Sequence, residues 1–482
     1  MPGASRCRST STARGTIGPS SISKFILSLL LQFGRLLGLF LCAVDPAAAH
    51  GFGQRFDLPL PLWLWVGGAG ATLVVTFVVI ALFVREVRLP RVRLFSLGNA
   101  PLSLLRLAAF LILLLTLAAG FFGTQDPYRN LAPTMVWVLW WVGFAFMCAL
   151  IVDLWALANP LAVFPEAPGV MRYPARLGAW PAVALFFAFA WAELVWRDND
   201  VPSYLAAALL AYAALTWAGM LLFGRGAWLM HGEAFSLAFG ILGRFAPLEL
   251  AGRELRLRAP GAGLVGERAQ SFSMLVFVLL MLATVTFDGF METPLYQQWA
   301  GIAQDSRLLY ELSELGLGES EVAATLGLAA FPVVFLGAYW LTAWCMARVA
   351  GAASVSRVAS AFVLSLVPIA VAYHLAHYFS LLVTAGQFII PLASDPFGFG
   401  WNLFGTAQYK VDLGILSPYV FWYSAVVLIV AGHAIAVFVA HLEASRLFGN
   451  RRAALASQVP LLVLMVAYTM LSLWILAQPI VG

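Results

Sequence analysis

The sequence has 482 residues, of which 62% are hydrophobic and 11% charged, and its mean hydropathy is +0.89. This composition excludes an ordinary soluble domain and indicates that lipid is the main solvent of the chain. The formal net charge of +5 comes from arginines in scattered short clusters, so it does not indicate nucleic-acid binding. Because backbone groups in hydrocarbon need internal partners and no barrel-type alternation is present, we expect an all-α polytopic membrane protein.

The amino terminus has the pattern of an export signal. Residues 1–24 are rich in Ser and Arg without an acid, and an apolar core at 36–44 precedes Asp45-Pro46 and three alanines. We therefore expect a cleavable signal peptide at 1–49, cut after Ala49. His50 would then begin the mature chain, where its free amine and imidazole together suit a metal chelate. The alternatives are an ordinary exposed terminus and an uncleaved signal anchor.

Apolar runs long enough to span a bilayer, about 20 residues each, recur along the rest of the chain. They lie at 62–84, 103–123, 134–156, 178–195, 203–223, 273–291, 322–347, 358–382, 418–441 and 456–478. The pattern predicts a single membrane domain over 50–482 with about ten transmembrane helices.

Arginines set the predicted orientation. They gather in alternate connections, at 85–93, 172–176, 225–268, 348–357 and 446–452, whereas the other connections carry single cations. By the positive-inside rule the arginine-rich connections face the cytoplasm, and both termini of the mature chain lie outside. We therefore expect a multi-pass protein of the bacterial inner membrane with a functional face toward the periplasm.

Three connections are longer than turns. Residues 224–272 mix arginines with apolar residues, which predicts a cytoplasmic segment with a helix lying in the membrane interface. Residues 292–321 form an acidic periplasmic loop around one amphipathic stretch. Residues 383–417 form a second periplasmic loop, and its aromatic residues among Gly and Pro suit a lid that dips back into the membrane.

Ionisable residues inside the apolar runs are the candidates for function, because charges at membrane depth are costly and usually face a cavity or a partner. No nucleotide-binding, serine-hydrolase or zinc-protease motif is present. His374 and His377 are three residues apart in AYHLAHYF, which places both imidazoles on one helix face, about 60° apart. Asp288 and Glu193 lie near the outer ends of their helices, and His433 lies near the middle of the following helix.

These residues predict a site that opens to the periplasm. We expect His374, His377 and Asp288 to hold a divalent metal ion, with His50 folding over it, and Glu193 or His433 to move protons. The alternatives are a proton relay or substrate-binding site without metal, and histidines that only join helices by hydrogen bonds. Haem ligation by His374 with His433 is a further possibility, if the two face each other.

Three segments carry a family resemblance: AHGFGQRFDLPLPLWLW, the stretch from AYHLAHYF to AQYKVD, and GHAIAVFVAHLEA. They resemble bacterial membrane proteins described as fenitrothion hydrolase components, over the chain from His50 to the last helix. The resemblance implies membrane-bound hydrolysis of organophosphorus triesters together with a second membrane subunit. It implies no catalytic residues.

The resemblance and the predicted site combine into one hypothesis. A metal-bound hydroxide would attack the phosphorus of a small apolar triester that reaches the site through the membrane. Four aromatic side chains of the second periplasmic loop would pack against the substrate's ring: Phe397, Phe399, Trp401 and Phe404. Two other function classes fit the same residues, a transporter or copper-type metal-handling protein and a non-catalytic subunit of a membrane complex.

Overall fold

The computed structural model describes residues 60–84, 89–164, 166, 168–266, 270–304, 311, 318–352 and 354–481. The chain forms two units, residues 1–50 and 51–482, and all described residues belong to the second. The predicted signal peptide, its cleavage site and His50 lie outside the described residues, so those predictions stay predictions.

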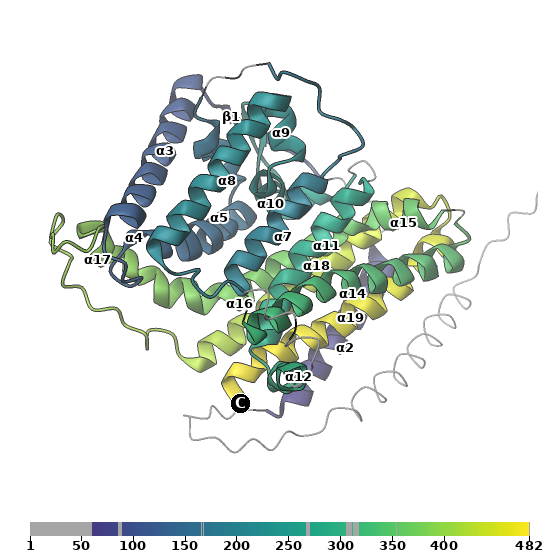
Figure 1. Cartoon of the computed structure of the whole chain (residues 1–482). Helices are drawn as coiled ribbons and strands as arrows, with labels where there is room; N and C mark the ends of the chain where they lie inside the picture. Colours follow the sequence, from purple (N-terminus) through teal and green to yellow (C-terminus); the bar gives the residue numbers. More distant parts are fainter. Residues whose placement is uncertain are drawn as a thin grey trace, which may run out of the picture. The chain divides into compact units, whose positions relative to one another are not determined.

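The second unit is a helical bundle (Figure 1), and nine helices of the described residues are long and apolar enough to cross a membrane. Seven of them are α2 (Leu62–Phe83), α3 (Asn99–Phe122), α8 (Pro202–Phe223), α11 (Phe272–Met291), α14 (Glu319–Ala350), α18 (Pro418–Leu447) and α19 (Arg451–Val481). The other two are composite helices over Leu131–Leu150 and Val355–Ser394. The predicted class, an all-α polytopic membrane protein, is confirmed.

The composite helices contain local irregularities. The first joins α4 (Leu131–Pro133), a π-helix η1 (Thr134–Gly143) and α5 (Phe144–Leu150). The second joins α15 (Val355–Phe362), η4 (Val363–Leu366), α16 (Val367–Ala385), η5 (Gly386–Phe388) and α17 (Ile389–Ser394). The predicted 383–417 loop is therefore helical as far as Ser394. Pro391 does not break α17 because it lies in the first turn, where no backbone donor is needed.

The one predicted run that is not among these nine, 178–195, forms the 15-residue helix α7 (Trp180–Leu194). It begins late because Gly178 has φ +47°, and Pro181 follows at the start of the helix. The predicted acidic loop 292–321 contains α12 (Pro294–Gln304). Short helices also form at α6 (Leu154–Ala158), η2 (Pro160–Ala162) and η3 (Ala262–Leu264).

Close packing holds α16 in the centre of the bundle. It packs on α18, which also contacts α19 and α2, while α11 lies against α7, α14 and α16. A Cβ added at Gly432 of α18 would lie 2.2 Å from the Cβ of Ala372 and 2.7 Å from the carbonyl oxygen of Pro368. Only glycine allows this approach, so the position of α16 against α18 is fixed by backbone contact.

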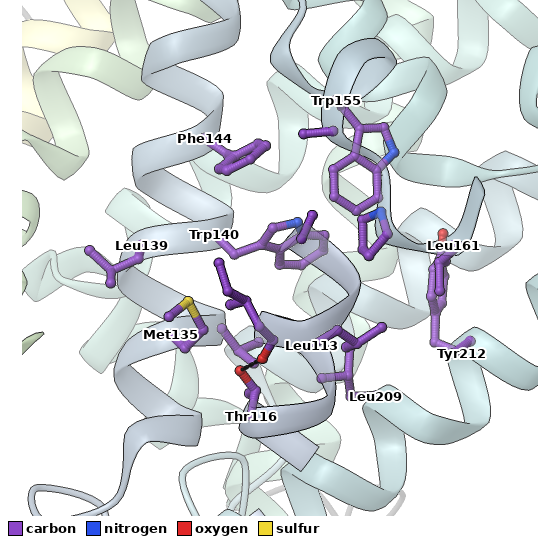
Figure 2. Close-up of a pocket in the computed structure, with 16 residues that line it drawn as sticks. Leu113, Thr116, Met135, Leu139, Trp140, Phe144, Trp155, Leu161, Leu209 and Tyr212 are labelled. Carbon is purple, nitrogen blue, oxygen red and sulfur yellow. Dashed lines mark hydrogen bonds between the residues drawn. The ribbon is translucent and has the colours of Figure 1, made fainter. Parts of the chain in front are cut away.

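A separate group of helices, α3, η1, α5 and α8, surrounds an apolar cavity of about 210 Å³. Figure 2 shows the Trp140 and Trp155 rings in its wall, with Leu113 and Thr116 of α3 on one side and Tyr212 of α8 on another. Helix α3 has only 11% of its most apolar window buried by the protein, so most of its surface is left for the bilayer.

The predicted interfacial segment 224–272 has a different structure from the one expected. It forms α9 (Arg225–His231), α10 (Ala234–Gly243) and a hairpin of β2 (Leu248–Ala251) and β3 (Glu254–Leu257). Phe235 and Phe239 of α10 are fully enclosed by α5, α6 and α7. The reason is that α10 is apolar on all sides, which favours burial in protein over a one-sided position at the interface.

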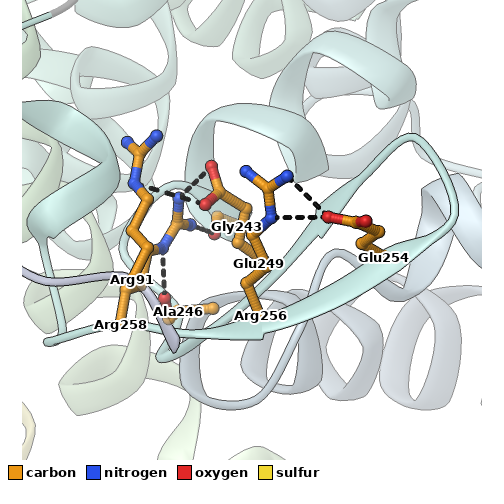
Figure 3. A network of polar contacts seen from close by, with 7 residues as sticks. All are labelled: Arg91, Gly243, Ala246, Glu249, Glu254, Arg256 and Arg258. Carbon is orange, nitrogen blue, oxygen red and sulfur yellow. Dashed lines mark hydrogen bonds and ion pairs between the residues drawn. The ribbon is translucent and has the colours of Figure 1, made fainter. Parts of the chain in front are cut away.

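A small antiparallel sheet, not expected from the sequence, closes this end of the bundle, and we call it the sheet end. Strand β1 (Val92–Ser96) pairs with β3, giving the order β1-β3-β2. Arg258 donates to the carbonyl oxygens of Gly243 and Ala246 at 2.8 and 3.0 Å, and its Nη1 lies 3.0 Å from Glu249 (Figure 3).

Three further ion pairs stabilise the sheet. Arg91 lies 3.4 Å from the second carboxylate oxygen of Glu249. Arg256 and Arg93 both contact Glu254, and the hydrogen bonds from Arg256 hold the pKa of that carboxyl below its ordinary value. The arginines from which the membrane orientation was predicted therefore also stabilise the sheet.

We expect Arg258→Ala to lower the free energy of unfolding by roughly 3 kcal/mol, because it leaves Glu249 and two carbonyl oxygens without their buried donor. Thermal unfolding of the purified protein in detergent measures the change. Arg256→Ala removes a more exposed arginine two residues earlier, in β3, and should change the unfolding temperature much less. Equal effects of the two substitutions would contradict the assigned role of Arg258.

Candidate functional site

Asp288, near the end of α11, accepts two hydrogen bonds from one turn of α16. Its Oδ2 lies 2.8 Å from His377 Nε2 and 2.7 Å from the Tyr378 hydroxyl. Because an ionised carboxylate only accepts, Nε2 of His377 carries the proton, and Nδ1 keeps a lone pair. Nδ1 forms no hydrogen bond with the described residues, so the imidazole can take up a second proton there.

The His377–Asp288 dyad lies in the wall of a cavity of about 550 Å³, which we call the dyad cavity. The side chains of His377 and Asp288 are 16% and 18% exposed, so both reach it. Polar groups from α16 and from the end of α11 share the wall with apolar residues of α18 and α19. Besides the dyad, the polar lining residues are Glu292, Tyr378, Ser380 and Thr384. Its size is within the range of small-molecule sites, roughly 300–1,000 Å³.

Behind the dyad, Tyr378 connects Asp288 to Glu193 of α7. The Tyr378 oxygen lies 3.5 Å from Glu193 Oε1, at the limit of a hydrogen bond. Glu193 and Tyr378 also line a small enclosed space between α7 and α11. The predicted proximity of Glu193 and Asp288 thus exists, but Glu193 is not among the residues that line the dyad cavity.

His374 does not line the dyad cavity, and its ring lies 4.7 Å from the Tyr378 ring. Its ring lies 5.4 Å from the Trp141 ring and 5.9 Å from the Phe146 ring, and its buried Nε2 has no hydrogen-bond partner among the described residues. Within the described ranges no group of three or more His, Cys, Asp or Glu side chains is placed to hold a metal ion. The predicted metal site of His374, His377, Asp288 and His50 stays a prediction, because His50 lies outside the described residues.

His433 lies in the interior of the bundle, beside Tyr468 of α19. Its side chain is fully buried and its Nδ1 is 2.8 Å from the carbonyl oxygen of Ile429. Its ring is 5.9 Å from the Tyr468 ring. His433 thus faces α19 while His374 faces the π-helix, so the two do not face each other as haem ligands would.

The four predicted substrate-binding aromatics lie in the coil after α17. Phe397 stacks on Phe399 at 5.3 Å, and Trp401 is 5.5 Å from each. Phe404 is 72% exposed. The Phe397 carbonyl accepts a hydrogen bond from Thr124, which ties this cluster to the end of α3. None of the four lines the dyad cavity, where Phe421 of α18 supplies the aromatic ring.

The sequence reasoning missed Tyr378, Ser380 and Thr384. All three stand in the stretch that begins with AYHLAHYF. Ser380 and Thr384 follow His377 by three and seven residues, a spacing that places all three on the same helix face. Tyr378 has no such spacing signal, because it directly follows His377 and lies about 100° away around the helix.

Access through the dyad cavity predicts selective chemical modification. We expect diethyl pyrocarbonate to modify His377 of the purified protein faster than His374 or His433, because only His377 reaches the cavity with a free ring nitrogen. Peptide mass spectrometry over a time course measures the three rates. Modification of His433 at the rate of His377 would contradict the cavity as described.

Comparison with known proteins adds no assignment. No family model, no curated protein and no solved structure matches this chain.

Proposed function

We propose that the chain is a membrane-bound hydrolase of small apolar esters, with organophosphorus triesters as the substrate class. The observation that carries the proposal is the His377–Asp288 dyad in the wall of the dyad cavity. The substrate class comes from the resemblance stated above. An apolar triester partitions into lipid, which would bring it to a bundle of apolar helices.

In the proposed reaction His377 is the general base. Its Nδ1 takes a proton from a water molecule as the water oxygen forms a bond to phosphorus, and the bond from phosphorus to the aryl oxygen breaks. The aryl oxide leaves with the bonding electron pair, and Asp288 stabilises the imidazolium through Nε2–H. Tyr378 holds the carboxylate in place by its own hydrogen bond. The steps assigned to His377, Asp288 and Tyr378 do not use a metal ion.

The proposal includes a location and a partner. We place the protein in the bacterial inner membrane with the dyad cavity toward the periplasm, after removal of residues 1–49, and with a second membrane subunit. The arginines of the sheet end support this orientation, since α11 begins beside the sheet end and carries Asp288 in its last turn, where Asp288 bonds His377. N-terminal sequencing tests the cleavage.

Matched histidine variants test the chemistry. We expect His377→Gln to slow nitrophenol release from a nitrophenyl triester by about 100-fold or more, because the general base is lost. His374→Gln makes the same change three residues earlier, away from the cavity, and should keep most of the activity. The assay uses membranes that contain the protein with its natural partner, and immunoblotting checks the amounts.

A chelator separates this mechanism from the metal hypothesis. Activity that survives treatment with a chelator supports a metal-free general base. Loss of activity on chelation, together with equal loss in both histidine variants, would support the predicted metal site instead. Full activity of His377→Gln would overturn the proposal.

The cytoplasmic position of the sheet end has its own test. Gly301→Cys in α12 and Gly449→Cys between α18 and α19 are both at open positions, with no atom within 4 Å of an added Cβ. We expect an impermeant thiol reagent to label Gly301→Cys in intact spheroplasts and Gly449→Cys only after lysis, since they lie at opposite ends of the bundle. The opposite labelling pattern would reverse the orientation.

One observation favours a second candidate function, proton-coupled transport. The Tyr378 hydroxyl joins the dyad to Glu193 in the enclosed space behind it, and hydrolysis has no need of this second carboxylate. Buried acids in series with a histidine are typical of proton relays in transporters. Substrate uptake by proteoliposomes without product formation would favour this function over hydrolysis.

A further inference from the structure

The apolar cavity between α3, η1, α5 and α8, shown in Figure 2, is separate from the dyad cavity and has no role in the proposed reaction. Its wall is almost entirely apolar, and its two polar side chains are already bonded. Thr116 donates to the carbonyl oxygen of Ile112, and Tyr212 donates to Glu233. Cavities of this kind exclude water and bind apolar groups.

A cation marks the end of this cavity nearest the sheet. Arg106 precedes Ala109, Leu113 and Thr116 on α3, and spacings of three, seven and ten residues place all four on one helix face. Arg106 lies seven residues after Asn99, which is about 10 Å along the helix. From this depth in a bilayer that α3 spans, the long arginine side chain can extend its guanidinium to the headgroup level.

The charge of Arg106 is poorly balanced. Its single hydrogen bond within the described residues is long, 3.4 Å to the carbonyl oxygen of Ala156, and no described carboxylate pairs with it. Arg225 lies close enough for electrostatic repulsion with Arg106. Arg225 pairs with Glu166 at 3.1 Å, and that carboxylate is 63% exposed. Two cations and one exposed acid leave a net positive site beside the apolar cavity.

We propose that this cavity binds an anionic membrane phospholipid. One acyl chain lies in the cavity along α3, and the phosphate lies between Arg106 and Arg225. The sparsely covered surface of α3 gives a lipid access from the bilayer, and the two guanidiniums select a negative headgroup. The bound lipid would fasten α3 and α8 to the segment 156–164, which both arginines also contact.

Thermal stability and native mass spectrometry of the delipidated full chain test the proposal. We expect phosphatidylglycerol to raise the unfolding temperature and to remain bound, whereas phosphatidylcholine with the same acyl chains and inorganic phosphate do neither. Arg106→Gln should abolish the preference for phosphatidylglycerol. Ala109→Phe, which fills the cavity, should abolish binding while the arginines remain.

Two controls keep the test specific. Arg357→Gln removes an exposed arginine from α15, at the same end of the bundle, and should keep the phosphatidylglycerol response. His377→Gln should also keep it, so that failure of the hydrolase proposal and failure of this one are distinguishable. Equal binding of both lipids, or unchanged binding by Arg106→Gln or by Ala109→Phe, would overturn the lipid site.

Discussion

The hydrogen bonds received by Asp288 are the interaction on which the proposed function depends. A carboxylate inside a membrane bundle is strongly destabilising unless its oxygens have donors. Here both donors come from adjacent residues of α16, so a single turn of one helix satisfies the acid of another. The same two bonds orient the imidazole and connect α11 to α16 at the cavity wall. The two hydrogen bonds that stabilise the Asp288 carboxylate therefore also prepare His377 for the proposed chemistry.

Charged side chains are accommodated differently at the two ends of the bundle. At the sheet end, arginines and glutamates pair across strands, and backbone carbonyl oxygens accept the remaining donors of Arg258. At the opposite end, Asp288, His377 and Glu193 lie in or behind a cavity. The first arrangement stabilises the fold, whereas the second leaves the Nδ1 of His377 available for chemistry. This division explains why abundant arginines contribute nothing to the dyad.

Hydropathy predicted the spans well because apolar length is a property of each segment alone. It also placed Asp288 and His377 at the same end of the bundle, which the structure confirms. The sheet escaped prediction because β1 and β3 are far apart in sequence and too short to show a pattern. The directions of His374 and His377 escaped it as well. Two residues 60° apart share a face, but contact with Trp141 or Asp288 depends on which neighbouring helix each one meets.

The glycine at position 432 has a consequence for motion. Since α16 and α18 touch backbone to backbone there, neither can slide or rotate without the other, and they behave as one rigid body. The coil of residues 395–417 joins α17 to α18 at the mouth side of this pair. Widening of the dyad cavity therefore requires α11, α19 or the coil to shift relative to that body, since Leu413 and Leu416 of the coil also line the cavity.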